Sequence, residues 1–124
     1  MVIALPWPPS VNHYWERNRN GSVRVGQAGR AYRDTVGWKC RQERISGLRG
    51  RLAVSIKASP PDRRKRDLDN LLKAILDALQ HGGAYEDDSQ IDELTIKRLP
   101  PSTPGFVTVE ITASSSAPAT PATR

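Results

Sequence analysis

The chain has 124 residues, enough for one domain with a modest hydrophobic core. Its single cysteine, Cys40, excludes an intrachain disulfide, and no stretch approaches the roughly 20 apolar residues of a membrane-spanning helix, so we expect a cytoplasmic protein without a membrane partner. The net charge of +6 favours a phosphate-rich partner such as nucleic acid, although an anionic membrane or a merely solvated basic surface fits the same number.

The first half of the chain predicts two main strands, a short third strand and one long helix. Residues 2–5 form a short apolar run typical of a strand, and the prolines after it forbid a helix or a central strand. Residues 11–29 are polar and predict a loop or a loose hairpin, with a short strand at 22–25. Residues 27–45 lack proline and predict a helix, and the alternating residues 52–58 predict a half-buried strand. The expected apolar face of that helix holds Ala31, Val36, Trp38 and Ile45.

The second half predicts a helix and two further strands. A helix should begin near Asp67 and end at Gly82, because leucine and isoleucine recur at helical spacing between them. This stripe consists of Leu68, Leu71, Leu72, Ile75, Leu76 and Leu79. Residues 91–99 and 106–112 predict two strands joined by a turn and running antiparallel. Residues 113–124 are rich in Ala, Ser, Thr and Pro and are expected to be a disordered tail.

These elements define the expected fold. It is a small single domain, residues 1–112, of the mixed α/β (α+β) class, with two helices packed on a mixed sheet. The expected order of elements is β-α-β-α-β-β.

The charge reverses inside the segment DRRKRDLDNLLK, residues 62–73. Residues 1–66 hold 15 Lys and Arg against 4 Asp and Glu, a balance of +11, whereas residues 67–124 hold 4 against 9, a balance of −5. The plain interpretation of the two acids at this boundary is structural: Asp67 caps the helix, and Asp69 interacts favourably with the helix dipole.

Three features favour a functional interpretation instead. Asp69 and Lys73 are four residues apart and lie off the leucine stripe, so they share one exposed edge. A further acidic cluster, residues 86–88, follows the glycine turn and is able to return toward the sheet. Arg63, Arg64, Lys65 and Arg66 directly precede the acids. Carboxylates that bind Mg²⁺, beside cations that bind phosphates, are the combination that metal-assisted phosphodiester cleavage requires.

The residues also resemble a known family. LPWPPSVN at 5–12, AYRD at 31–34, PDRRKRDLDNLLKAILDAL at 61–79 and DDSQID at 87–92 are similar to segments of the RusA-type Holliday junction resolvases, which are crossover junction endodeoxyribonucleases of bacteria and their prophages. The resemblance runs from about Ile3 to Thr112 and is most specific in the central block. It implies a homodimer that binds four-way junction DNA and makes paired, symmetric nicks with Mg²⁺ or Mn²⁺, in DNA recombination and repair.

The resemblance also implies roles for individual residues. The metal-binding and catalytic acids are expected at Asp67, Asp69 and Asp88, with Lys73 as the essential lysine. The expected DNA contacts are Arg63, Arg64, Lys65, Arg66, Asn70 and Tyr14, although packing in the core is an equal alternative for Tyr14. Two other functions stay open at this point: a non-catalytic branched-DNA-binding protein, and a metal nuclease that cuts flaps or forks.

Overall fold

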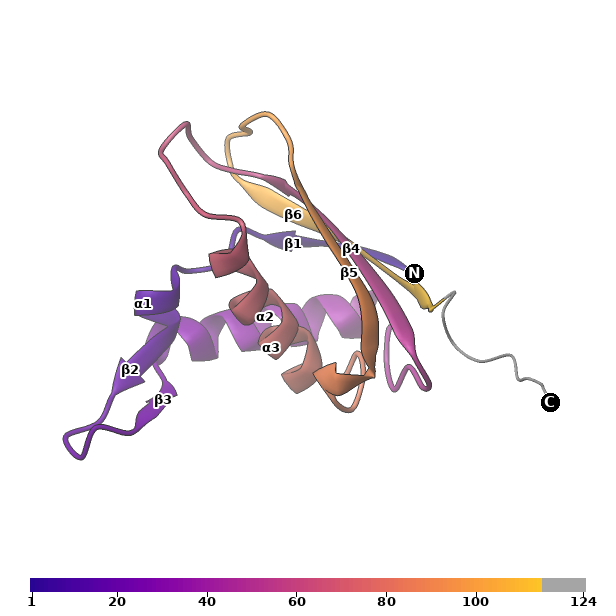
Figure 1. Ribbon diagram of the computed structural model, residues 1–124, viewed down its shortest axis with the longest axis horizontal. Coiled ribbons are helices and arrows are strands. Elements are labelled where there is room, and N and C mark those ends of the chain that lie inside the picture. Colours follow the sequence, from indigo (N-terminus) through magenta and orange to yellow (C-terminus); the bar gives the residue numbers. More distant parts are fainter. Residues whose placement is uncertain (115–124) are drawn as a thin grey trace.

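A four-stranded sheet forms the centre of the fold (Figure 1). The computed structural model describes residues 1–114. The sheet has the strand order β1-β6-β4-β5, in which β6 is antiparallel to both of its neighbours and β4 is parallel to β5. The strands are β1 (Val2–Pro6), β4 (Leu52–Ser59), β5 (Ile91–Arg98) and β6 (Phe106–Ala113).

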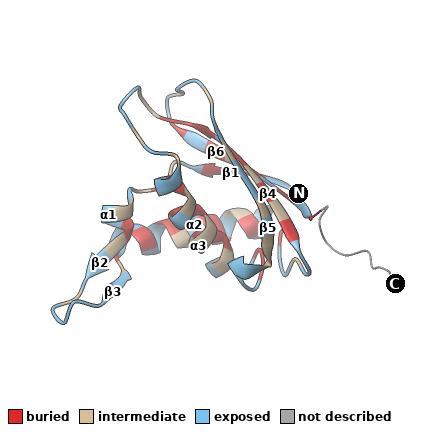
Figure 2. Ribbon diagram, in the orientation of Figure 1, coloured by how far each residue is buried: buried red, intermediate tan, exposed pale blue. Residues whose placement is uncertain are grey.

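Alternating side chains give this sheet one buried and one open face (Figure 2). The buried face carries Ile3, Leu5, Leu52, Val54, Ile56, Val107, Val109 and Ile111, each at most 3% exposed. The opposite face carries Val2, Ser55, Lys57, Thr108 and Glu110. The period of two in the sequence therefore identified these strands and their inward side chains correctly.

Two helices, α2 (Gln27–Gln42) and α3 (Asp69–His81), pack on the buried face of the sheet. The leucine stripe of α3 is confirmed: Leu71, Ile75 and Leu79 are buried, and the other three leucines pack against the core. The predicted face of α2 is partly wrong, because Trp38 is 63% exposed and Ala31 is also exposed. The buried stripe of α2 instead follows Tyr32, Val36 and Cys40, spaced four residues apart.

The pairing of the last two strands differs from the prediction. β5 and β6 do not pair with each other, because β4 lies between them. The physical reason is burial: Val107, Val109 and Ile111 of β6 are at most 2% exposed, whereas Leu94 of β5 is 41% exposed. The strand with the more complete apolar face takes the central position, and β5 becomes an edge.

Four short elements lie outside the predicted order of longer elements. The structure confirms the loose hairpin and the short strand expected within residues 11–29, as the antiparallel pair β2 (Trp15–Arg17) and β3 (Val23–Val25). It adds the helix α1 (Val11–Tyr14) and the 3₁₀ turn η1 (Asp88–Gln90), which are too short to show a helical period in the sequence. No helix within residues 1–114 has the length and hydropathy needed to cross a membrane.

The C-terminal edge of the domain lies slightly beyond the predicted boundary at residue 112. Ala113 still belongs to β6, and the backbone N–H of Ser114 donates to the carbonyl oxygen of Arg51 at 3.0 Å. The rest of the predicted tail, residues 115–124, lies outside the described residues.

Candidate active site

Asp62 organises the cationic loop that joins β4 to α3. Its Oδ1 accepts a hydrogen bond from the backbone N–H of Arg64 at 2.9 Å and pairs with Nη1 of Arg66 at 2.7 Å. The bond from Arg66, followed by that from Arg64, lowers the pKa of this carboxyl. Arg63 and Lys65 make no ion pair within residues 1–114. The loop therefore has two braced and two available cations.

Arg66 is fixed on a second side by an aromatic ring. Its guanidinium lies 5.7 Å from the ring centroid of Trp7, within the range of a cation–π contact. Its carbonyl oxygen accepts a hydrogen bond from Nη2 of Arg98 at 2.6 Å. These contacts connect the loop to β5 and to the segment after β1. The sequence did not single out Asp62 or the Trp7–Arg66 contact, because both depend on the shape of the loop.

The two acids at the start of α3 are not helix caps. The helix begins at Asp69, and the residue before it, Leu68, already has helical backbone angles without a capping side chain. Asp67 and Asp69 are exposed, and neither forms an ion pair or side-chain hydrogen bond within residues 1–114. The capping interpretation of Asp67 is therefore wrong, and both carboxylates are available to a ligand.

Asp67 lines a hollow of about 700 Å³ between the cationic loop and the segment that follows β1. The loop side contributes Lys65, Arg66, Asp67 and Asn70, and the opposite side contributes Trp7, Pro8, Ser10, Val11 and Asn12. Lys73 lines a neighbouring hollow of about 810 Å³ together with Trp15, Glu16, Arg17 and Val23. Val11 and Asn12 line both hollows, so the two hollows adjoin at α1, and together they are called the groove below.

Asp88 lies at the opposite end of α3 from Asp69. Its backbone N–H donates to Oε1 of Gln80, in the last turn of the helix, at 2.9 Å. A helix of 13 residues is about 18 Å long, so the two acids cannot share an ion within one chain. Within residues 1–114 no three Asp, Glu, His or Cys side chains form a possible metal site. The expected convergence of three aspartates in one chain is therefore wrong, because α3 separates them.

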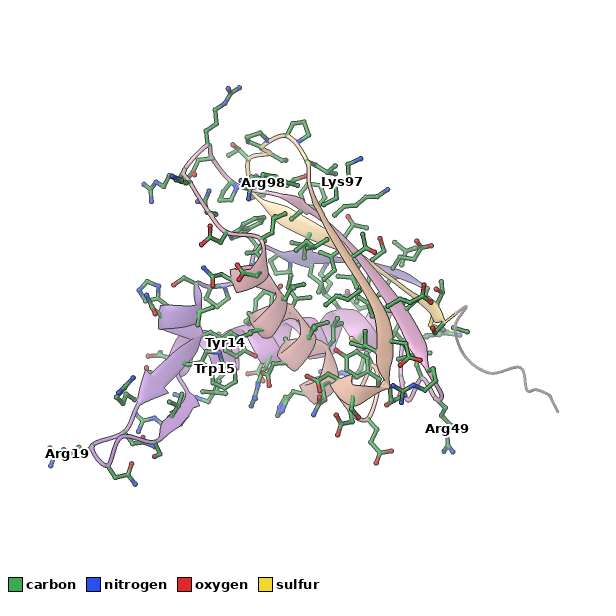
Figure 3. The ribbon with its side chains drawn as sticks, viewed as in Figure 1. Tyr14, Trp15, Arg19, Arg49, Lys97 and Arg98 are labelled. Carbon is green, nitrogen blue, oxygen red and sulfur yellow. The ribbon has the colours of Figure 1, made fainter. Side chains whose placement is uncertain are left out.

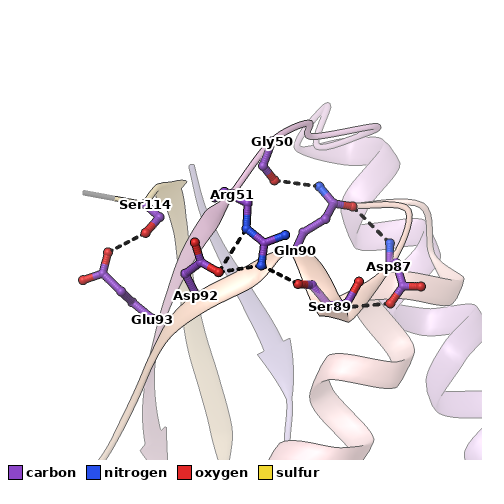
Figure 4. Close-up of polar contacts among 8 residues, drawn as sticks. All are labelled: Gly50, Arg51, Asp87, Ser89, Gln90, Asp92, Glu93 and Ser114. Atoms are coloured by element: carbon purple, nitrogen blue, oxygen red, sulfur yellow. Dashed lines mark hydrogen bonds and ion pairs between the residues drawn. The ribbon is translucent and has the colours of Figure 1, made fainter. Parts of the chain in front are cut away.

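The two neighbouring aspartates at η1 have different surroundings, and Figure 4 shows those of Asp87. Asp87 caps the turn by accepting from the backbone N–H of Ser89 at 2.9 Å, and this bond lowers the pKa of Asp87. Gln90 ties the turn to residues before β4 by donating to the carbonyl oxygens of Leu48 and Gly50, each at 3.0 Å. Partial desolvation, followed by the nearby Asp87, raises the pKa of Asp88.

Tyr14 is not a DNA-stacking residue, and this prediction is wrong. Its side chain is completely buried, and its hydroxyl donates to Oδ2 of Asp77. The same carboxylate accepts two hydrogen bonds from Arg33, at 2.8 Å to Nε and 3.0 Å to Nη2. Asp77 therefore joins α3 to α1 and α2. Figure 3 shows Tyr14 at the inner end of α1, beside Trp15.

The fold and site describe a small basic α+β domain in which free carboxylates adjoin cations suited to a polyanion. A family profile described as "Endodeoxyribonuclease RusA" matches residues 6–112. The chain is 40% identical over 111 residues to the crossover junction endodeoxyribonuclease RusA of Escherichia coli (strain K12), which covers 89% of this chain and 92% of that protein. A relative with the same name from Enterobacteria phage 82 shows the same identity and coverage.

Another such relative, from Enterobacteria phage HK97, is 41% identical over 97 residues, covering 77% of this chain and 80% of that protein. The chain therefore belongs to the RusA family of endodeoxyribonucleases, as its sequence motifs predicted. This is an enzyme family, and its profile includes the cationic loop, the start of α3 and η1.

Proposed function

We propose that this protein is a structure-selective endonuclease that resolves four-way DNA junctions by paired, symmetric nicks during recombination and repair in the cytoplasm. The observation that carries the proposal is the position of two unpaired acids beside a cationic loop: Asp67 lines the groove with Lys65 and Arg66, and Asp69 begins the helix that also carries Lys73. Membership of the RusA family supports it, as do the names of the bacterial and phage relatives.

Cations along the groove would bind the DNA backbone. Arg63 and Lys65 have no acidic partner within residues 1–114 and are available to phosphates, whereas Arg64 and Arg66 are partly neutralised by Asp62. Asn70 lines the hollow beside Asp67 and offers an amide to a phosphate or a base edge. The braced Arg66 would fix the position of the strand, and the available cations would supply most of the attraction.

Asp67 and Asp69 suit a hard divalent cation, because exposed carboxylates without competing partners are the ligands that Mg²⁺ prefers. One chain supplies two of the three expected acids, so the third must come from elsewhere. We propose a homodimer in which Asp88 of a second copy lies at the start of α3, and its two-fold symmetry would build two equivalent sites. Paired cutting by two related sites then follows from the assembly.

Each residue of this site has a separate task. The carboxylates would hold the cation, and Lys73, one helical turn beyond Asp69, would neutralise negative charge that develops on the phosphate oxygens. A bound Mg²⁺ or Mn²⁺ would supply an activated water and additional charge neutralisation at the phosphorus. The cationic loop would orient the backbone so that the scissile phosphate lies at the acids.

The test is cleavage of a synthetic four-way junction with and without Mg²⁺, beside fork, flap and duplex substrates. Asp69→Asn should bind the junction at least as tightly as the unaltered protein, because a charge that repels phosphate is removed. The same variant should lose cleavage by at least about 100-fold. Asp34→Asn is the matched control, because Asp34 is exposed on α2 and makes no ion pair within residues 1–114.

Three outcomes would count against this function. Junction cleavage by Asp69→Asn at the normal rate would refute the site. Binding without cleavage under any divalent metal would favour a non-catalytic branched-DNA-binding protein. Preferential cutting of flaps or forks would favour a nuclease with a different substrate.

A further inference from the structure

The hairpin formed by β2 and β3 projects from the body of the protein (Figure 1). It does not join the four-stranded sheet, and it contacts mainly α1 and α2. A two-stranded hairpin alone is at best marginally stable in water, so an extended one needs further contacts to hold its shape. Trp15 and Val25 at its base pack against the core, whereas the other strand residues are exposed, so the outer part of the hairpin is able to contact a partner.

Hydrogen bonds hold the tip of the hairpin in one shape. The backbone N–H of Asn18 donates to the carbonyl oxygen of Ser22 at 2.7 Å, and Asn18 Nδ2 donates to Ser22 Oγ at 2.8 Å. Oδ1 of Asn20 accepts from the backbone N–H and the hydroxyl of Ser22, at 3.0 and 2.6 Å. At the base, the N–H of Gly26 donates to the carbonyl oxygen of Tyr14 at 2.9 Å. Preorganisation of this kind reduces the entropy lost on binding.

The hairpin has a net positive charge that its own contacts leave available. Its one acid, Glu16, is neutralised by Arg24, whose Nη2 lies 3.0 Å from Glu16 Oε1. Arg17 and Arg19 form no ion pair and no side-chain hydrogen bond within residues 1–114. Arg19 extends from the outermost turn into solvent (Figure 3). The hairpin therefore carries two unpaired guanidinium groups, and its one acid is already paired with Arg24.

The base of the hairpin borders the groove of the candidate active site. Arg17 and Val23 line the same hollow as Lys73, and that hollow adjoins, at Asn12, the one lined by Asp67. A strand of nucleic acid lying along the groove would pass from the acids over α1 to Arg17. The position beside this groove favours DNA over an anionic membrane, which would need a broader apolar surface than Val23, the one exposed large apolar side chain of the hairpin.

We propose that the β2–β3 hairpin is a DNA-binding element that holds the sugar–phosphate backbone of a junction arm through Arg17 and Arg19. This inference rests on the proposed function, because it extends the path of the DNA beyond the acids. The hairpin contacts phosphates and contributes affinity without taking part in the chemistry.

The experiment measures junction affinity in EDTA, where no cleavage occurs, at salt concentrations between about 50 and 200 mM. Arg17→Ala/Arg19→Ala should reduce the slope of log affinity against log salt by about 1.8, because each lost phosphate contact accounts for about 0.9. Affinity at about 0.1 M salt should fall on the order of 10- to 100-fold. Lys57→Ala/Lys97→Ala is the charge-matched control, since these neighbouring residues lie on the open face of the sheet and should change the slope far less.

The outcomes distinguish a failure of the hairpin proposal from a failure of the proposed function. If the unaltered protein binds and cuts junctions but the hairpin variant keeps the same salt slope as the control, the hairpin proposal alone is wrong. If the unaltered protein binds no DNA, the proposed function and the hairpin proposal both fail. At saturating enzyme and with Mg²⁺, the hairpin variant should cut at nearly the normal rate. Loss of cutting at saturation would show instead that the residues act at the chemical step.

A second pair of variants checks that charge is responsible. Arg24→Ala exposes the carboxylate of Glu16 to the groove, and it should weaken junction binding by about 3- to 10-fold. Glu16→Gln/Arg24→Ala loses the same ion pair without leaving an uncompensated charge, so it should bind more tightly than Arg24→Ala. Equal affinities for the two variants would overturn the assignment of this face to DNA.

Discussion

A single carboxylate, Asp77, joins three helices. It accepts hydrogen bonds from Tyr14 of α1 and Arg33 of α2 while it lies in the middle of α3. Burial alone would oppose its ionisation, but the bonds from Arg33 and then Tyr14 outweigh that effect and lower the pKa of Asp77. α1 forms the ridge between the two hollows, so this cluster also sets the shape of the groove.

Asp77→Asn should destabilise the protein. The amide leaves Arg33 without its counter-ion at a site where both side chains are only about a quarter exposed, as their exposed fractions of 22% and 26% show. We expect a loss of about 1–3 kcal/mol in the free energy of unfolding, measured by urea denaturation at neutral pH. Asp34→Asn on α2 should change the same quantity by less than about 0.5 kcal/mol.

The lowered pKa of Asp77 also predicts how the stability difference between the unaltered protein and Asp77→Asn depends on pH. Because the folded state lowers the pKa of Asp77, its stabilising contribution is complete above the ordinary value of about 3.9 and is lost as the pH falls through the lower folded value. The difference in stability between the unaltered protein and Asp77→Asn should stay constant from about pH 7 to 5 and shrink below about pH 4. A difference that grows in acid would contradict this assignment.

At the scale of elements, two glycines meet where the C-terminal end of α3 lies against α2. A methyl group added to Gly82 would lie 3.1 Å from the Cα of Gly37, whereas one added to Gly37 would meet nothing closer than 3.7 Å. The two positions are therefore not equivalent, although both have backbone angles that alanine adopts easily.

Gly82→Ala should destabilise the domain by about 1–3 kcal/mol, because the added carbon forces the two helices apart. Gly37→Ala should be neutral or should stabilise by up to about 1 kcal/mol, because alanine favours the helix and its side chain fits. Thermal unfolding of the two variants, compared with the unaltered protein, measures both effects. The opposite ranking would mean that the helices do not cross as described.

The sequence predicted elements well where a period was long enough to be seen. The leucine stripe of α3 and the alternation in β4 and β6 cover two or more turns or several residue pairs, so they identified the inward faces correctly. Trp38 was misplaced because a large apolar residue was assumed to be buried, whereas its ring is exposed and lies 4.8 Å from the guanidinium of Arg41. The local sequence pattern could not predict the order of the strands in the sheet, because that order depends on which strand buries more surface.

The whole molecule decides how the active site is completed. The local sequence marked Asp67 and Asp69 as more than caps, and the structure agrees that they cap nothing. The distance between Asp69 and Asp88 was not predictable, because it depends on the length and direction of α3 between them. The proposed site shared between two copies would accommodate this separation.

Mixing two inactive variants tests the shared site. If Asp69 of one copy works with Asp88 of the other, a heterodimer of Asp69→Asn and Asp88→Asn contains one intact site and one doubly altered site. Random exchange should then restore about a quarter of the active sites, seen as single nicks in junction DNA. If each site lies within one chain, the mixture should stay as inactive as either variant, and a strictly monomeric protein would give the same result.

The position of β6 also has a consequence for synthesis of the chain. This strand lies between β1 and β4, and it is the last strand to be translated. A ribosome-bound chain that has emerged only as far as β5 lacks the strand that links the N-terminal edge to the rest of the sheet. A DNA-cutting enzyme built in this way would acquire its shape, and hence its capacity for damage, only after translation of nearly the whole domain.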